Sequence, residues 1–473
     1  MLNEKSDRLV VAGKWVTTME QRGRENRKSK QFASSRLSSH KTMTMKLLRL
    51  KSLSKEQHGM CFNNVQHIID VELLEAAFHR LDERKAVGLD GVSKAMYAKN
   101  LQANLADLKE RIRRHAYKPQ LAKQVLIPKA NGKTRPIAIS TVEDKMVQMA
   151  VAMILDALYE PLFMDVSTGF RPKRGCHDAL HKVYHLLKGN YRPYVVDCDI
   201  KSFFDSMNHE KLMEFVERRV SDKNFTRLIR RLLKMGVMTT DEEWKLNETG
   251  SPQGSVVSPI LANIYLHYVI DVWFRESFKK YEQQMVRYAD DTVFCFKDPQ
   301  AAELFLTSLK TRLKENHLEL NEDKTRIVEF KKDGNNIFDF LGFTLYWGKT
   351  KERVKLLKTK TSAPKLRKAI LEFKLWIKAN RNRHRLKELW SMAAQKLRGH
   401  YAYFGTTVNN KLGFYYFTCT QLLHKWLNRR SQKRSFSWES FQKKLKQDPL
   451  PKPWGCKCLN LNQLVLDFDV GDF

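Results

Sequence analysis

Two adjacent carboxylates, Asp290 and Asp291, stand inside the segment 285–296, where apolar and β-branched residues flank them on both sides. Such flanks predict two short strands joined at a tight turn, a position that favours Asp. A carboxylate pair can also present several oxygen atoms to a divalent cation, and Mg²⁺ prefers oxygen ligands. Because turn chemistry alone explains an isolated pair, a metal site requires a further carboxylate elsewhere in the chain.

A further carboxylate follows a second apolar stretch, 194–198, where Asp199 precedes an aromatic pair. Nucleotidyl transfer by two metal ions needs carboxylates from different strands, with the ions about 3.5–4 Å apart. Asp199 and Asp290 are 91 residues apart (290 − 199), which leaves room for helices between two neighbouring strands. Asp197 and Asp205 are alternative ligands by composition, and spacing does not choose among them.

The composition indicates a folded protein that binds a polyanion. The 473 residues carry a formal net charge of +33, and 42% of them are hydrophobic, which separates this chain from a disordered basic tail. No apolar run reaches 18 residues, so no membrane span is expected. The seven cysteines are scattered without the spacing of a zinc site, which favours a reduced, intracellular setting.

Several motifs resemble, in the same order, those of the bacterial group II intron reverse transcriptases, or maturases, of the type that lacks an endonuclease domain. Asp199 with Phe204 resembles motif A, 250–259 resembles motif B, and 288–291 resembles motif C. The resemblance implies an α+β fold, a right-hand polymerase with fingers, a ferredoxin-like palm and a helical thumb. The implied regions are a basic N-terminal extension, fingers, palm, thumb and a short tail, at 1–60, 61–185, 186–347, 348–434 and 435–473.

The resemblance also implies a catalytic centre with two Mg²⁺ ions, for which Mn²⁺ could substitute. The implied metal ligands are Asp199, Ile200, Asp290 and Asp291. Lys324, in a segment that resembles motif D, is expected to protonate the leaving pyrophosphate, although an ordinary surface lysine would give the same pattern.

Four residues are expected to bind the incoming nucleotide. Lys129 and Arg135 lie on a predicted hairpin, 125–137, and match positions that grip the triphosphate in related enzymes. Phe204 is expected beneath the sugar, where it would exclude a 2′-hydroxyl, and the amide of Gln253 is expected to contact the nucleotide or the template. Relatives often have glycine where this chain has Ser255, which leaves the local backbone conformation open.

Two basic segments are expected to contact nucleic acid. The loop 169–175 has two glycines and three cations, and its Arg171 and Arg174 suit the phosphates of a template strand, whereas His177 is expected to be structural. The segment 349–434 has 23 Lys and Arg against 3 Asp and Glu. Its expected RNA-binding cations, which could instead cap helix ends, are Arg398, Lys425, Arg429 and Arg430.

The two ends of the chain give less specific patterns. Residues 1–57 carry 14 Lys and Arg against 5 Asp and Glu, with little hydrophobic periodicity. A flexible extension that contacts RNA is expected there, with an organellar transit peptide as the alternative. The tail 435–473 lacks the length and the ligands of a metal endonuclease, so no second-strand nickase is expected, and a remnant of a DNA-binding segment remains open.

These observations together predict an RNA-directed DNA polymerase that binds its intron RNA, assists its splicing and copies it into DNA. The implied partners are the structured intron RNA, an RNA template with a DNA primer, deoxynucleoside triphosphates and a DNA target, and no membrane. The expected location is the bacterial cytoplasm, at the nucleoid. The alternatives are a reverse transcriptase without an intron that acts in defence or repair, and an RNA-binding splicing factor whose polymerase is vestigial.

Overall fold

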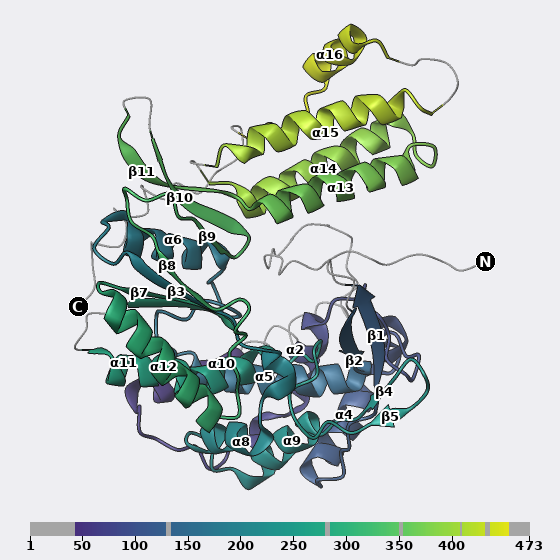
Figure 1. Ribbon diagram of the computed structural model, residues 1–473. Coiled ribbons are helices and arrows are strands. Elements are labelled where there is room, and N and C mark those ends of the chain that lie inside the picture. Colours follow the sequence, from purple (N-terminus) through teal and green to yellow (C-terminus); the bar gives the residue numbers. More distant parts are fainter. Residues whose placement is uncertain are drawn as a thin grey trace.

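The computed structural model describes residues 43–128, 134–279, 284–349, 353–406, 409–430 and 436–453. The described chain contains three sheets, one in the fingers, one in the palm and one that leads into the thumb. Figure 1 shows the thumb helices α13 to α16 set apart from the fingers and the palm. This arrangement confirms the expected right-hand fold of mixed helices and sheets. Among the described residues, no helix is both long and apolar enough to cross a membrane.

The fingers are built around one buried helix, α5 (Val142–Tyr159). Thr141 caps it by accepting a hydrogen bond from the main-chain nitrogen of Asp144, and nearly all the side chains of the helix are buried. The helices that pack nearby are one over 43–56, η1 (Gln66–Ile68), α2 (Val71–Arg80), α3 (Lys94–Ala98) and α4 (Leu101–Arg113). The apolar residues of α5 therefore form much of the fingers core.

A small sheet completes the fingers, in the order β2-β1-β4-β5. β1 (Ala122–Pro128) and β2 (Thr134–Ile139) pair antiparallel, which confirms the predicted hairpin, although its tip lies outside the described residues. β4 (Val237–Met238) pairs parallel to β1 and antiparallel to β5 (Trp244–Lys245).

The palm is a four-stranded antiparallel sheet in the order β6-β7-β3-β8. Its strands are β3 (Tyr194–Cys198), β6 (Gln284–Tyr288), β7 (Asp291–Phe296) and β8 (Arg326–Glu329). Numbered along the chain, the order is 4-1-3-2, with helices inserted after the first and third strands, which is the ferredoxin-like arrangement that the sequence predicts.

The palm sheet separates two hydrophobic cores. Because side chains alternate along a strand, Val196 and Phe294 face α12 (Pro299–Glu315) and the fingers, whereas Val195 and Cys295 face α6 (Cys176–Lys188) and the thumb. The remaining helices of this part are α7 (Phe203–Ser206), α8 (His209–Glu217), α9 (Lys223–Leu233), α10 (Ser258–Leu266), η2 (His267–Asp271) and α11 (Val272–Ser277).

The thumb follows a third antiparallel sheet, β11-β10-β9. The strands are β9 (Phe338–Phe340), β10 (Phe343–Lys349) and β11 (Lys355–Thr361), and the helices are α13 (Ala363–Asn380), α14 (Leu386–Phe404), α15 (Lys411–Leu427) and α16 (Trp438–Gln447). His177 at the start of α6 donates from Nε2 to the carbonyl oxygen of Tyr403 at 2.6 Å. This bond joins α6, which packs against the palm sheet, to the thumb, and it supports the structural role expected for His177.

Both ends of the described chain are more ordered than the sequence predicts. In the helix over 43–56, Met43 and Leu50 are buried in the fingers core, and Lys46 pairs with Asp70 at 2.5 Å. In the tail, α16 inserts Phe441 into the thumb core. These apolar residues recur at helical spacing, but long stretches of basic and polar residues obscure that pattern.

Candidate active site

A two-residue turn between β6 and β7 carries the carboxylate pair. Tyr288 pairs with Asp291 across the turn, and Ala289 takes a left-handed φ of +58°. β3 pairs antiparallel with β7 so that Cys198 lies opposite Thr292. One residue further along this register, Asp199 lies opposite Asp291, so the fold brings together the three carboxylates that the sequence predicts.

A fully buried ion pair supports the turn from behind. Arg287 and Asp271 are both 0% exposed, and Arg287 donates from Nε and Nη2 to the two carboxylate oxygens of Asp271 at 2.7 and 2.6 Å. From Nη1 it donates to Asn263 Oδ1 and to the carbonyl oxygen of Ala289, both at 3.1 Å. Arg287 is not among the residues predicted from the sequence, although an arginine inside an apolar strand was the available signal.

The loop before α6 packs directly against the same turn. A Cβ added at Gly169 would lie 2.3 Å from the main-chain nitrogen of Ala289, so no other residue fits without a shift of the turn. Asn263 Nδ2 donates to the carbonyl oxygen of Gly169 at 2.9 Å. The main-chain nitrogen of Thr168 donates to the carbonyl oxygen of Arg287, also at 2.9 Å. This loop, the turn and α10 therefore hold one another in place.

The pKa values of Asp290 and Asp291 both lie above the usual range of a carboxylate. Desolvation, followed by the charges of Asp290, Asp199 and Asp197, raises the pKa of Asp291 above its usual range. Burial and the charge of Asp199 also raise the pKa of Asp290, while Arg135 and Lys324 oppose that rise. Such a cluster has a net attraction for cations.

Asp199 is fixed by two donors from the segment after α12. Asn321 Nδ2 donates to Asp199 Oδ2 at 2.8 Å, and Lys324 Nζ donates to the same oxygen at 2.9 Å. Burial raises the pKa of the neighbouring Asp197 to about 6, and its Oδ2 lies 3.8 Å from Arg326 Nε. Ile200 is buried, so only its main-chain oxygen could serve as a metal ligand.

The fingers hairpin reaches the palm through a chain of three polar side chains. Arg135 Nε donates to Gln253 Oε1, and Gln253 Nε2 donates to Asp205 Oδ1 at 3.2 Å. Two predicted nucleotide-binding residues are thereby in contact, and Asp205 contacts Gln253 rather than joining the carboxylate cluster. The other hairpin residue expected to bind nucleotide, Lys129, lies outside the described residues.

The loop that resembles motif B depends on two glycines with positive φ, Gly250 at +78° and Gly254 at +106°. A Cβ at either position would lie within 3 Å of a main-chain carbonyl oxygen. Ser255 does not need a positive φ and is buried, so the departure from the pattern of relatives is accommodated. Phe203 belongs to the core, whereas Phe204 is only partly buried.

The two predicted template-binding arginines differ in exposure. Arg171 is buried, and its guanidinium donates to both carboxylate oxygens of Glu160 and to the carbonyl oxygens of Met164 and Ser167. The structure therefore assigns Arg171 to the interior of its loop rather than to a template phosphate. Arg174 is partly exposed and pairs with Asp165.

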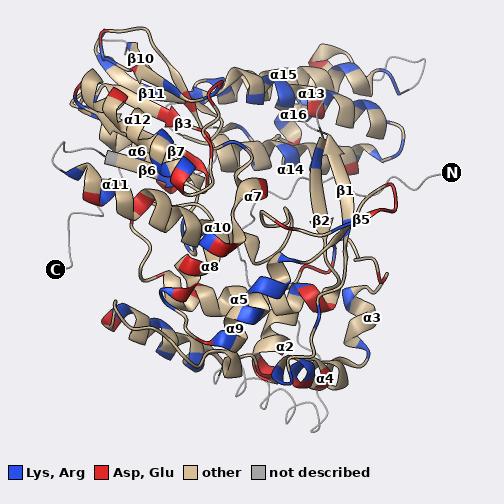
Figure 2. Cartoon of the chain, turned by 60° about the horizontal axis from the view of Figure 1, so that its bottom comes forward, with Lys and Arg blue, Asp and Glu red and all other residues tan. Residues whose placement is uncertain are grey.

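The four predicted cations of the thumb also differ from one another. Arg398 and Lys425 are exposed on α14 and α15. Arg429 lies over the ring of Trp426 at 5.4 Å, and Arg430 donates to the carbonyl oxygen of His384 at 3.0 Å. Figure 2 shows Lys and Arg recurring along the thumb helices, with few Asp and Glu among them.

The carboxylate cluster fits a divalent cation by its chemistry, because carboxylate oxygens are the ligands that Mg²⁺ prefers. Among the described residues, however, no three His, Cys, Asp or Glu side chains are arranged so that they alone could hold an ion. Ions here would also need oxygen atoms from water or from substrate phosphates, as Mg²⁺ commonly does where phosphates react.

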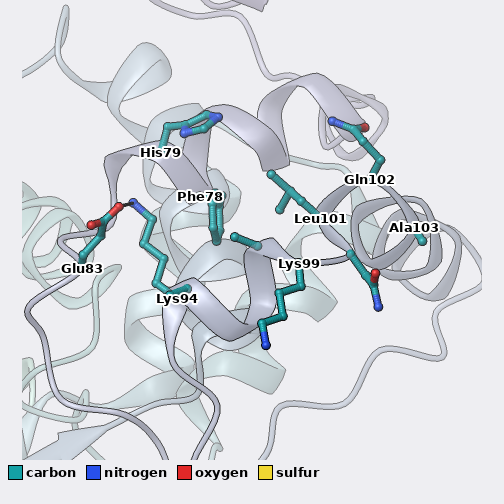
Figure 3. A pocket seen from close by; sticks show the side chains of 11 residues that line it. Phe78, His79, Glu83, Lys94, Lys99, Leu101, Gln102 and Ala103 are labelled. Atoms are coloured by element: carbon teal, nitrogen blue, oxygen red, sulfur yellow. Dashed lines mark ion pairs between the residues drawn. The ribbon is translucent and has the colours of Figure 1, made fainter.

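A cavity of about 570 Å³ lies in the fingers, between α2 and the start of α4 (Figure 3). Phe78 and Leu101 line it together with several polar residues, and one of these, Lys94, already donates to the carbonyl oxygen of Leu81 at 2.7 Å. None of its lining residues belongs to the carboxylate cluster, and it has no paired carboxylates. We therefore place the candidate active site at the turn between β6 and β7.

Comparison with known proteins gives a family match and several relatives that agree with the geometry of the candidate active site. The model of the family described as reverse transcriptase (RNA-dependent DNA polymerase) matches residues 127–345. Protein YkfC of Escherichia coli K12 is 34% identical over 311 residues, which cover 58% of this chain and 80% of that protein.

Two further relatives are much longer than the part that matches. Group II intron-encoded protein LtrA of Lactococcus lactis is 33% identical over 229 residues, which cover 47% of this chain and 37% of LtrA. An uncharacterized 91 kDa protein in the cob intron of Schizosaccharomyces pombe is 45% identical over 145 residues, 31% of this chain and 18% of that protein. The matched family, the order of the motifs and the juxtaposed carboxylates agree: this chain belongs to the reverse transcriptase family of RNA-dependent DNA polymerases.

Proposed function

We propose that this protein is an RNA-directed DNA polymerase that binds an intron RNA, assists its splicing and copies it into DNA. The observation that carries the polymerase activity is the placement of Asp199 opposite Asp291, beside Asp290, at the end of the palm sheet. Members of this family generally use divalent metal ions. Two Mg²⁺ ions held by Asp199, Asp290, Asp291 and the main-chain oxygen of Ile200 would activate the primer 3′-hydroxyl and stabilise the leaving oxygen.

The cations around the cluster would handle the triphosphate. The primer 3′-hydroxyl loses its proton to solvent, its oxygen forms a bond to the α-phosphorus, and the bond from that phosphorus to the pyrophosphate oxygen breaks. Arg135, whose charge already acts on Asp290, and Lys129 would bind the triphosphate, and Lys324 would give a proton to the leaving pyrophosphate. Gln253, held between Arg135 and Asp205, would orient the nucleotide or the template base.

Phe204 would select the sugar. Its ring is partly buried and lies 5.4 Å from Phe203, in the segment that directly follows Asp199. A ring in this place would exclude a 2′-hydroxyl by contact. Phe204→Val should raise the incorporation of ribonucleotides relative to deoxynucleotides. Unchanged discrimination in an active variant would show that Phe204 is an ordinary core residue with no role in sugar selection.

The role in splicing rests on the similarity to LtrA, described as a group II intron-encoded protein, and on the exposed basic surface of the thumb. Arg398, Lys425, Arg429 and Arg430 are the proposed RNA contacts. The further proposed partners are an RNA template with a DNA primer, deoxynucleoside triphosphates and a DNA target, and the proposed location is the bacterial cytoplasm at the nucleoid.

The polymerase activity is tested by extension of a DNA primer on an RNA template. Asp290→Asn should reduce the rate at least about 1000-fold, because the metal site contributes several kcal/mol to the transition state. Asp333→Asn is the matched control, since its side chain is 95% exposed and its ion-pair partner is Lys355 rather than a residue of the cluster. Extension by Asp290→Asn at the wild-type rate would reject the site.

The splicing role is tested separately with the same variants and a self-splicing intron RNA. Asp290→Asn should bind this RNA and assist its splicing as the wild type does, because the thumb cations remain. If the wild type extends primers but never promotes splicing, a reverse transcriptase of defence or repair is favoured. If it promotes splicing without extending any primer, the polymerase is vestigial.

A further inference from the structure

An exposed aromatic side chain stands beside the carboxylate turn in an unfavourable backbone conformation. Phe170 is 48% exposed, and its φ of +56° lies in the left-handed region that a bulky residue rarely adopts. Its ring centroid lies 6.5 Å from that of Tyr288, the residue that immediately precedes the turn. An apolar ring that is both exposed and held in a strained conformation needs an explanation other than core packing.

The loop around Phe170 fixes the position of this ring. On one side, Gly169 is packed against the main chain of Ala289, so the backbone of the loop touches the turn itself. On the other side, Arg171 is buried and donates to Glu160 and to main-chain carbonyl oxygens of the preceding segment. Both neighbours of Phe170 are thus held in place, so the backbone of Phe170 lies beside the turn that carries Asp290 and Asp291.

We propose that Phe170 is a binding site for a nucleobase, on which an unpaired or terminal base of the primer–template stacks. This inference rests on the proposed polymerase function, because it takes the carboxylates as the place where the primer end lies. Bases stack on aromatic rings irrespective of their sequence, which suits an enzyme that copies any template. Because the backbone on both sides of Phe170 is held in place, the loop itself has little conformational freedom to lose when the base binds.

The test is a double-mutant cycle between the ring and the base. Phe170→Asn removes the ring but keeps a residue type that tolerates positive φ, so folding should be preserved. The equilibrium affinity is measured for a DNA primer on an RNA template with a single-stranded overhang. A set of templates carries one abasic residue, placed in turn at each position near the primer end.

Phe170→Asn should weaken binding of the intact primer–template about 5- to 150-fold, the range that loss of one stacked base produces. One abasic template should weaken binding by the wild type to a similar extent, and Phe170→Asn should weaken binding of that template less than about twofold, because the lost interaction is the same. Phe170→Tyr keeps the ring and should bind as the wild type does.

Additive effects of Phe170→Asn and the abasic residue at every position would overturn the proposal, as would unchanged affinity in Phe170→Asn. A change in sedimentation of Phe170→Asn with unchanged affinity would assign the ring to a protein interface instead. Because the binding assay needs no catalysis, it separates the two proposals. Absence of primer extension by the wild type rejects the polymerase function, whereas absence of coupling in an active enzyme rejects only the nucleobase site.

Discussion

In the palm, Arg287 and Asp271 are both fully buried and bond to each other, whereas in the thumb the cations lie at the surface and over aromatic rings. Arg381 lies 4.9 Å from the ring of Trp426, and Lys444 lies 4.9 Å from that of Trp390. A buried arginine with a carboxylate partner fixes the main chain around it. A cation on an aromatic face keeps part of its charge open to solvent and so to a polyanion.

Basic residues therefore have different roles in the two regions: they stabilise the fold in the palm and remain available for binding in the thumb. In the palm, charge holds the catalytic turn in shape, and its loss leaves a buried carboxylate without its arginine partner. In the thumb, aromatic packing provides the stability, as in the stack of His400 on Tyr415 at 3.8 Å, and charge remains available for binding. Variants that alter the two regions in matched ways should therefore fail in different ways.

The largest expected effect is the loss of the buried arginine. Arg287→Ala removes both bonds of the arginine to the buried Asp271, which among the described residues keeps only His267 at 3.7 Å, and removes the donor to Ala289, so the free energy of unfolding should fall by about 3–5 kcal/mol. Arg398→Ala, on the exposed face of α14, is the matched control and should change it by less than about 0.5 kcal/mol. Chemical denaturation measures the free energy of unfolding of both variants. An equal loss in the two variants would contradict the proposed difference between palm and thumb.

A second prediction concerns the pH dependence of the thumb. Burial lowers the pKa of His400 to about 4 from a usual value near 6.5, and its Nε2 has no hydrogen-bond partner in the described part of the chain. The unfolded state therefore binds a proton first as the pH falls. Stability should be lost progressively between about pH 6.5 and pH 4, by up to about 3 kcal/mol.

His400→Phe should flatten this loss, because the ring stacking on Tyr415 is kept while the titrating group is removed. Thermal unfolding between pH 7 and pH 4.5 measures it, with the wild type as reference. If the wild type and His400→Phe lose stability in parallel over that range, groups other than His400 determine the acid sensitivity of the thumb.

Two glycines sharpen the comparison further. Gly169→Ala places a methyl group 2.3 Å from the main chain of Ala289 and should move the carboxylate turn, which should reduce kcat about 100-fold. Gly399→Ala, in α14, meets nothing within 4 Å and should instead raise stability by about 0.5–1 kcal/mol through helix propensity. Primer extension and denaturation are measured for both; a full kcat in Gly169→Ala would show that the turn tolerates displacement.

The sequence predicts the catalytic strands well, for a physical reason. Alternating or continuous apolar residues predict each strand, and the resemblance to motifs A and C singles out Asp199 from Asp197 and Asp205. The pairing register of the structure then places Asp199 opposite Asp291. The support behind the turn could not be predicted in the same way. Arg287 meets its partner Asp271 only because η2 brings residue 271 beneath the sheet, and local patterns do not encode that contact.

Local sequence patterns also fail to separate the buried cations from the exposed ones. Arg171 and Arg398 look alike in sequence, each a basic residue near glycine and aromatic residues. Only the structure separates them, since Glu160 lies within reach of Arg171, whereas the surface around Arg398 offers no ion-pair partner among the described residues. A count of basic residues thus predicts a polyanion partner for the chain but does not predict which side chains touch it.

The smallest expected effect is the most specific test of the thumb. Arg398→Ala with Lys425→Ala removes two exposed cations, and if each contacts a phosphate of structured RNA, the log–log salt slope should flatten by about 1.4 to 1.8 in total. Arg429→Ala with Arg430→Ala should flatten it less, because Arg430 is partly buried and already bonds to the carbonyl oxygen of His384, which leaves only Arg429 exposed over Trp426. The affinity for a folded intron RNA is measured at several salt concentrations for both pairs. A larger change for the second pair would show that cations at the end of α15 turn toward RNA despite these contacts, and an unchanged slope for both pairs would remove this surface from the RNA interface.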